Sequence, residues 1–191
     1  ELARTGLSSI GPGGLARVDG RDLLLAQWGE MIYMDAGTLK EVRRGPTKGL
    51  SPPVLIDLDG DGTPEIVAGD VWDSGKSLLA LDARTGKQIW CIEHHRPVRA
   101  GMALLDGLLW VADLAFVAGL DPRTGARRAE IPAPGPVCSV REFRGRLLFA
   151  TTRGRIALVT PPRDGAPAAV AWKLETGLAF IPESPVAAAD L

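Results

Sequence analysis

The sequence has little cysteine, little histidine and no excess of charge of either sign, and each shortage excludes a class of function. Its 191 residues include 22 Lys and Arg against 23 Asp and Glu, which gives a formal net charge of -1. A nucleic acid or an anionic membrane surface normally requires a basic excess, so neither is expected as a partner. No apolar run approaches the length of a transmembrane helix, and we expect no membrane span.

The two cysteines and two histidines do not have the spacing of the common metal sites. Cys91 and Cys138 are far apart and show no zinc-ligand or redox pattern. We expect two buried free thiols, although a disulfide between them stays an alternative. His94 and His95 are adjacent, and neighbouring residues on a strand point to opposite faces, so we expect no histidine metal site.

Glycine and proline, in contrast, are frequent, with 23 and 15 residues. One or the other interrupts nearly every window long enough for a helix, and no segment keeps a helical apolar period. Short runs rich in Val, Ile, Leu and Trp are bounded by Gly, Asp or Pro, which is typical of strands. The sequence therefore predicts an all-β protein.

Two landmarks recur along the chain at intervals of roughly 40 residues. The first is an apolar run that follows a turn glycine and closes at Ala26, Ala68, Ala112 and Ala150. The second is a turn that opens at Asp35, Asp82, Asp121 and Thr160. Because the two series repeat in phase, the chain is built of structural repeats. We place them at residues 10–45, 46–93, 94–134 and 135–175, with a further repeat beginning at 176–191.

Each repeat contains four short strand-like segments, which are clearest in the second repeat. There the predicted strands are 53–57, 65–70, 77–82 and 87–92. Four-stranded units of about 40–45 residues are typical of β-propeller blades, each of which buries its faces against its neighbours. We therefore predict a single β-propeller region over 1–191, with four-stranded antiparallel blades, about four of them present.

One further self-match concerns the completeness of this ring. Residues 5–7, Thr-Gly-Leu, recur at 176–178, and Asp19 recurs as Asp190. The C-terminal segment thus corresponds to the start of a fifth repeat. We interpret the chain as a partial ring completed by remaining blades of a longer protein, or as a half ring that forms a homodimer. A closed four-bladed ring is the less favoured alternative.

The segment Ala80–Trp90, ALDARTGKQIW, resembles the tryptophan-docking motif of pyrroloquinoline-quinone-type (PQQ-like) propeller repeats. Asp82 can accept hydrogen bonds from backbone N–H groups of its own turn, and Gly86 supplies the positive φ that the turn requires. The resemblance implies that Trp90 lies flat against the next blade. The third repeat keeps the turn, but Ala129 stands where the tryptophan would be.

The segment Asp57–Gly69, DLDGDGTPEIVAG, places carboxylates at alternate positions before an apolar run. It resembles the calcium loop of FG-GAP-type propeller repeats, which lies between a blade's first two strands. The D-x-D-x-D-G spacing directs oxygen ligands at one point, as a hard cation such as calcium requires. An EF-hand is excluded because Ala68 occupies its twelfth position. The alternative is an empty aspartate-rich turn. The expected calcium ligands are Asp57, Asp59, Asp61, the backbone carbonyl of Thr63, and Glu65.

These patterns predict a non-catalytic, calcium-stabilised β-propeller scaffold for protein–protein or ligand recognition, as part of a larger protein. The expected partner is a protein or an extended ligand, and an extracytoplasmic setting is favoured over a cytoplasmic one. Bound PQQ is not expected, because the resemblance implies a vicinal cysteine pair that the chain lacks. Two alternatives remain: the propeller portion of a polysaccharide-acting or quinone-dependent enzyme, and a propeller lipoprotein that assists outer-membrane protein assembly.

Overall fold

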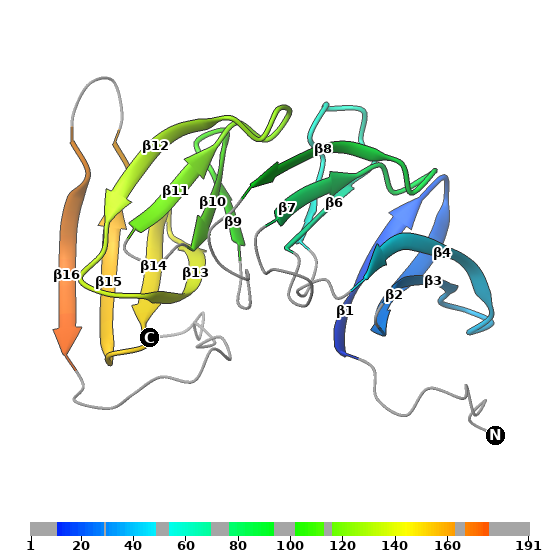
Figure 1. Cartoon of the computed structure of the whole chain (residues 1–191), viewed down its shortest axis with the longest axis horizontal. Helices are drawn as coiled ribbons and strands as arrows, with labels where there is room; N and C mark the ends of the chain where they lie inside the picture. Colours follow the sequence, from blue (N-terminus) through cyan, green and yellow to red (C-terminus); the bar gives the residue numbers. More distant parts are fainter. Residues whose placement is uncertain are drawn as a thin grey trace. The chain divides into compact units, whose positions relative to one another are not determined.

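The computed structural model describes residues 11–28, 30–48, 54–69, 77–93, 102–112, 116–162 and 167–175. These residues form sixteen strands in four antiparallel sheets, each with four strands in sequence order (Figure 1). They contain no helix, and so none that is long and apolar enough to cross a membrane. The prediction of an all-β fold of four-stranded antiparallel sheets is confirmed.

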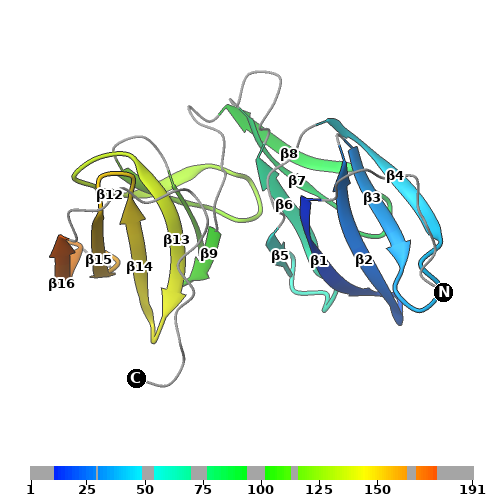
Figure 2. The same cartoon turned by 90° about the horizontal axis from the view of Figure 1, so that it is seen from below.

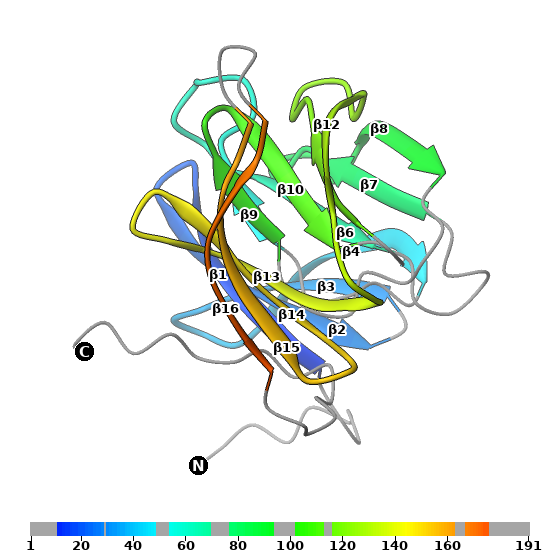
Figure 3. The same ribbon diagram turned by 90° about the vertical axis from the view of Figure 1, so that its left-hand side faces the viewer.

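The strands follow one another as four meanders. The first sheet, seen side by side in Figure 2, is β1 (Gly11–Val18), β2 (Arg21–Trp28), β3 (Glu30–Asp35) and β4 (Glu41–Lys48). The second is β5 (Val54–Ile56), β6 (Glu65–Gly69), β7 (Ser77–Leu81) and β8 (Gln88–Glu93). The third is β9 (Met102–Leu105), β10 (Leu108–Ala112), β11 (Phe116–Leu120) and β12 (Arg127–Pro132). The fourth, prominent in Figure 3, is β13 (Val137–Phe143), β14 (Arg146–Thr151), β15 (Arg155–Thr160) and β16 (Ala169–Glu175).

Both sequence landmarks fall at the same place in every sheet. The closing alanines all lie in the second strand, and the turn-opening residues lie at or just after the end of the third strand. In the second sheet the predicted strands 53–57, 65–70, 77–82 and 87–92 correspond to β5 to β8. The limits of the repeats, and the single region over 1–191, stay predictions.

Three of the four sheets close their first hairpin with a two-residue turn. Its two central residues both have positive φ: Asp19 and Gly20, Asp106 and Gly107, and Arg144 and Gly145. This is the geometry of a type I′ turn, whose twist matches that of the flanking strands. The second sheet departs from it, because the closing pair Ile56 and Glu65 encloses the acidic loop instead.

The chain divides into two compact units, residues 1–97 and 98–191, each of which holds two sheets. In each unit, buried apolar side chains from both sheets form a shared core, and Ile32 and Met34 form a separate smaller cluster in the first sheet. The first core includes Leu25, Tyr33, Ile66 and Leu81, and the second includes Trp110, Val140, Leu147 and Phe149. Sheet therefore packs on sheet within a unit, and the apolar face of each sheet is removed from water by its partner.

The outer strand β8 shows where the cysteine prediction was wrong. Burial alternates along β8, with Trp90 buried and Cys91 exposed. Adjacent side chains on a strand point to opposite faces, so burial of the indole turns the thiol outward. Cys138 is buried as predicted, and both cysteines are free.

The contact of Trp90 with a following blade stays a prediction. His94 and His95, and residues 5–7 and 176–191, lie outside the described residues.

The core of the second unit is built around Trp110, whose side chain is fully buried. The indole Nε1 donates a hydrogen bond to the carbonyl oxygen of Leu105 at 3.2 Å. The ring lies over Gly119 of β11, where an added Cβ would come within 2.9 Å of Trp110 Cη2 and 3.2 Å of Ala129 Cβ. Gly119 is therefore required for its small size, since a methyl group there overlaps the ring.

Replacing Gly119 by alanine should lower the free energy of unfolding by about 2 kcal/mol, because the new methyl group overpacks the core. Gly37→Ala is the matched control, since its Cβ would meet Asp35 Oδ1 at an ordinary 3.5 Å. Denaturant unfolding followed by tryptophan fluorescence measures both variants. Equal effects of the two substitutions would contradict the assigned role of Gly119.

Candidate metal site in the second sheet

The acidic loop, residues 57–64, joins β5 to β6. Antiparallel pairing of Leu55 with Ile66 and of Ile56 with Glu65 fixes the two ends of the loop at the end of the sheet. Gly60 and Gly62 both have a φ of +84°, a left-handed conformation that side-chain-bearing residues rarely adopt. The two glycines allow the tight backbone bends of the loop, which bring the aspartates together.

The aspartate side chains themselves hold the loop in this shape. Asp57 accepts hydrogen bonds from the N–H groups of Gly60 at 2.7 Å and Gly62 at 2.9 Å, one on each carboxylate oxygen. The N–H of Asp61 donates to Asp59 Oδ1 at 3.1 Å, and the N–H of Thr63 donates to Asp61 Oδ1 at 2.8 Å. Backbone N–H donors thus orient the carboxylates without the help of a ligand.

The three aspartates converge as the spacing predicted. Asp57, Asp59 and Asp61 each offer a carboxylate oxygen, and these oxygens lie within 4.8 Å of one another on the exposed side of the loop. Exposed carboxylates placed this close repel one another, and a hard cation that binds oxygen would relieve the repulsion. The donor set therefore suits calcium in both charge and ligand type.

The predicted ligand Glu65 does not belong to this converging group, which contains only the three aspartates among the described residues. Neither Glu65 nor Thr63 is exposed as the aspartates are, since both side chains are buried. The Glu65 carboxylate accepts the N–H of Leu58 at 2.8 Å and so ties the start of the loop to β6. Burial raises the pKa of Glu65, and the charges of Asp59, Asp61 and Asp57 raise this pKa further. An additional positive charge in the loop would favour the ionised form of Glu65.

A cation that the sequence analysis did not identify already reaches the loop. The guanidinium of Arg84, in the turn between β7 and β8, lies 2.6 Å from Asp61 Oδ2 and 3.0 Å from Asp19 Oδ1. It also donates a hydrogen bond to the hydroxyl of Thr63. The bond from Arg84 is the main reason that the pKa of Asp61 is lowered.

The topology of a meander explains this contact. In a four-stranded meander the first and third hairpins lie at the same end of the sheet, because each strand reverses the direction of the last. The β5–β6 loop and the β7–β8 turn are therefore neighbours, as the pairing of Ile66 with Leu81 shows. That relation was available from the sequence once the strands had been assigned, and it places Arg84 beside the aspartates.

The turn that carries Arg84 has the predicted geometry. Asp82 Oδ1 accepts the N–H of Thr85 at 2.8 Å, and the Asp82 carbonyl accepts the N–H of Gly86 at 2.7 Å. Gly86 has a φ of +70°. Asp121 and Gly125 form the same turn in the third sheet, with a carbonyl-to-N–H distance of 2.8 Å. The predicted roles of the aspartate and the glycine are confirmed in both turns.

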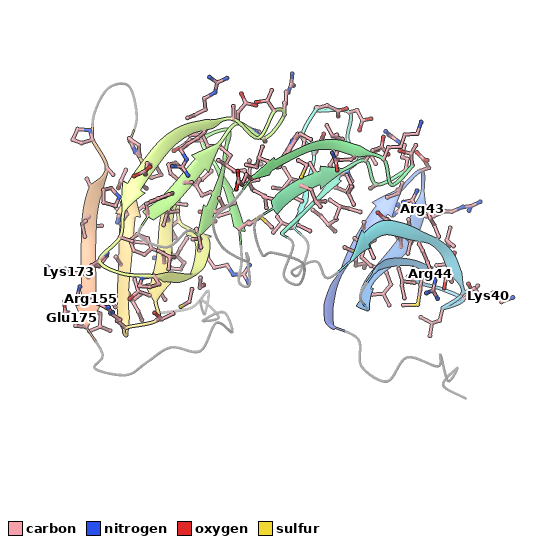
Figure 4. All side chains as sticks on the ribbon, viewed as in Figure 1. Lys40, Arg43, Arg44, Arg155, Lys173 and Glu175 are labelled. Atoms are coloured by element: carbon pink, nitrogen blue, oxygen red, sulfur yellow. The ribbon has the colours of Figure 1, made fainter. Side chains whose placement is uncertain are left out.

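The first sheet holds this turn through Arg43 on β4. One guanidinium nitrogen of Arg43 donates to the carbonyl of Ala83 at 2.6 Å, and another donates to the carbonyl of Arg84. The guanidinium also lies over the ring of Tyr33, 3.9 Å from its centroid. Figure 4 labels Arg43 and its neighbour Arg44. Arg44 instead bonds to Glu41 on its own strand at 2.8 Å.

Replacing Arg43 by lysine should lower the free energy of unfolding by about 1–2 kcal/mol, because a single ammonium cannot reproduce the forked contact with two carbonyls and the stacking on Tyr33. Arg44→Lys, one residue along β4, should change the free energy of unfolding by less than about 0.5 kcal/mol, since its ion pair is exposed. Thermal and denaturant unfolding would measure both. A loss of stability in Arg44→Lys as large as that in Arg43→Lys would contradict a stabilising role for the contacts between Arg43 and the β7–β8 turn.

Comparison with known proteins gives the fold. No protein-family model matches the chain, and neither does any curated protein sequence. Among solved structures, the chain is similar to Sqt1 from Saccharomyces cerevisiae, with a TM-score of 0.71 and 9% identity, over 93% of this chain and 52% of Sqt1. It is also similar to BamB from Moraxella catarrhalis, with a TM-score of 0.62 and 13% identity, over 93% of this chain and 54% of BamB. For the computationally designed protein Ika4 the TM-score is 0.61 and the identity 14%, over 81% of this chain and 92% of Ika4.

The chain thus spans about half the length of BamB and of Sqt1. Both are β-propellers, BamB of the PQQ-like type. At such low identity the likeness shows the fold alone. Together with the four meandering four-stranded sheets, it shows that this chain has the β-propeller fold, with four blades among its described residues.

Proposed function

We propose that this chain is a non-catalytic β-propeller scaffold for protein–protein or ligand recognition, and that one calcium ion stabilises its second blade. The observation that carries the proposal is the convergence of Asp57, Asp59 and Asp61, whose carboxylate oxygens lie within 4.8 Å of one another. The remaining expected ligands are Thr63, through its backbone carbonyl, and Glu65.

The residues of the loop fit such an ion. Carboxylates are the preferred ligands of calcium, and the backbone hydrogen bonds to Asp57 and Asp61 leave further lone pairs on their oxygens. The guanidinium of Arg84 on Asp61 shows that positive charge is accommodated at this position. When bound, calcium would join carboxylates from alternate positions of the loop, Asp57, Asp59 and Asp61, and so stabilise the β5–β6 hairpin.

The expected affinity is weak, on the order of 10⁻⁴ to 10⁻³ M, as for extracellular calcium modules. Two features support this range: the cluster is exposed, and the guanidinium of Arg84 lies 2.6 Å from Asp61 Oδ2. An affinity in that range suits a compartment with millimolar calcium, and we therefore propose an extracytoplasmic setting. The role as a scaffold rests on the rigidity of paired sheets, which hold their hairpins and turns in fixed positions for a partner.

The first test is the stability of Asp59→Ala in calcium and in chelator. At a free calcium concentration about 100 times the dissociation constant, the wild-type chain should gain about 2.7 kcal/mol of stability, and the variant should gain nearly none. In chelator the two should unfold at nearly the same temperature. Asp22→Ala removes an exposed aspartate of β2 and should keep the full calcium response. Equal calcium responses of wild type and Asp59→Ala would overturn the site.

The second test asks whether Arg84 competes with calcium. Arg84→Gln removes a positive charge 2.6 Å from a proposed ligand, so calcium should bind about three- to tenfold more tightly. Arg123→Gln is the matched control, because Arg123 holds the same position between Asp121 and Gly125 in the third sheet. Calorimetric titration measures both variants. Unchanged or weaker calcium binding in Arg84→Gln would contradict the competition.

A further inference from the structure

The guanidinium of Arg84 joins two sheets of the first unit. Its Nε donates a hydrogen bond to Asp19 Oδ1 at 3.0 Å, and its Nη1 donates one to Asp61 Oδ2 at 2.6 Å. The remaining nitrogen, Nη2, donates to the hydroxyl of Thr63. Asp19 belongs to the β1–β2 hairpin of the first sheet, whereas Asp61 and Thr63 belong to the acidic loop. Each nitrogen of the guanidinium therefore serves a different acceptor.

The backbone that carries this guanidinium is held in place from both sheets. Within the turn, the N–H of Gly86 donates to the carbonyl of Asp82 at 2.7 Å. From the first sheet, Arg43 donates to the carbonyl of Ala83 at 2.6 Å. Because the turn is fixed in this way, rotation of the Arg84 side chain is enough to shift the guanidinium between its two carboxylates.

The two carboxylates are unequal partners of Arg84. The side chain of Asp61 is 38% exposed, and that of Asp19 is 65% exposed. Water and salt screen the more exposed ion pair more strongly, so Asp61, which also makes the shorter contact, is the stronger partner. Both aspartates raise the pKa of Arg84, Asp61 more than Asp19. Arg84 thus stays a cation, with Asp19 as its second acceptor.

A calcium ion on Asp61 would change this balance. Two cations on one carboxylate repel each other, so the ion would weaken the hydrogen bond from Arg84 to Asp61. Asp19 already lies within hydrogen-bond distance of the same guanidinium and would keep it paired. Without the Asp19 carboxylate, calcium would have to displace Arg84 from Asp61 into water, which makes calcium binding weaker.

We propose that Asp19 is a positioning residue for the calcium site, because it accepts the Arg84 guanidinium when calcium binds Asp61. The inference rests on the proposed calcium site and adds to it a residue that is not a ligand and lies in another blade. Calcium binding in the second blade then strengthens the contact between Asp19 and Arg84, which joins that blade to the first.

The test is a double-mutant cycle on the calcium affinity of the full chain, measured by calorimetric titration. Asp19→Asn should weaken calcium binding about two- to fivefold, which is the size of effect that an exposed ion pair can have. In the Arg84→Gln background the same substitution should have almost no effect, because no guanidinium is left to reposition. A charge that acts only at long range would give equal losses in both backgrounds.

Asp106→Asn is the matched control, because Asp106 holds the same turn position in the β9–β10 hairpin. Its φ is 54° and that of Asp19 is 50°, and asparagine tolerates this conformation in both turns. The control should leave calcium affinity unchanged.

A second measurement follows the contact itself. The Nε–H NMR signal of Arg84 is assigned by its loss in Arg84→Gln. Calcium should slow the exchange of this proton with solvent in the wild-type chain and should not slow it in Asp19→Asn.

Three outcomes would overturn this proposal and leave the calcium site intact. They are unchanged calcium affinity in Asp19→Asn, an equal loss in Asp106→Asn, and equal losses with and without Arg84. Failure of the calcium site has a different signature. The wild-type chain would then give no heat of calcium binding, and its melting temperature would respond to calcium no more than that of Asp59→Ala. That result would overturn both proposals.

Discussion

Burial of one sheet face against another is the constraint on which the rest of this structure depends. A single four-stranded sheet of this chain has an apolar face that it cannot cover by itself, and in each unit two sheets cover each other. The packing is close enough that Gly119 must lack a side chain where the Trp110 ring crosses it. Once the faces are fixed, the hairpins and turns at the ends of the strands are fixed as well. The candidate sites lie in those hairpins and turns.

One chain of contacts joins the first sheet to the acidic loop of the second sheet. Arg43 extends from the first sheet to the carbonyls of a turn in the second, and that turn presents Arg84 to Asp61 and Asp19. Charges from two sheets thus meet at one end of the first unit. The charge of Arg84 is therefore shared between an aspartate of the first sheet and an aspartate of the acidic loop.

Much of the fold could be predicted because the same short strand and turn patterns recur in several repeats of the sequence. The turn opened by Asp82 and closed by Gly86 recurs at Asp121 and Gly125, so its backbone conformation follows from residue type. The convergence of the three aspartates likewise follows from their spacing and from two glycines. The contacts of Arg43 depend on how one sheet faces another, which no local pattern encodes. The exposure of Cys91 depends on which face of β8 is buried, and a free cysteine is compatible with either face.

The hairpin between the first two strands of a sheet tolerates an insertion in this fold. In three sheets the closing pair of β-residues encloses a two-residue turn, and in the second sheet the equivalent pair, Ile56 and Glu65, encloses a whole loop without disturbing the strands on either side. Loop closure adds little entropic cost for such a lengthening. The acidic loop could therefore be transplanted to another sheet. In place of the two-residue turn between Leu105 and Leu108, it would join two strands of the second unit. The converging carboxylates would then move from one blade to another, because the strands of both blades pair in the same way at this hairpin.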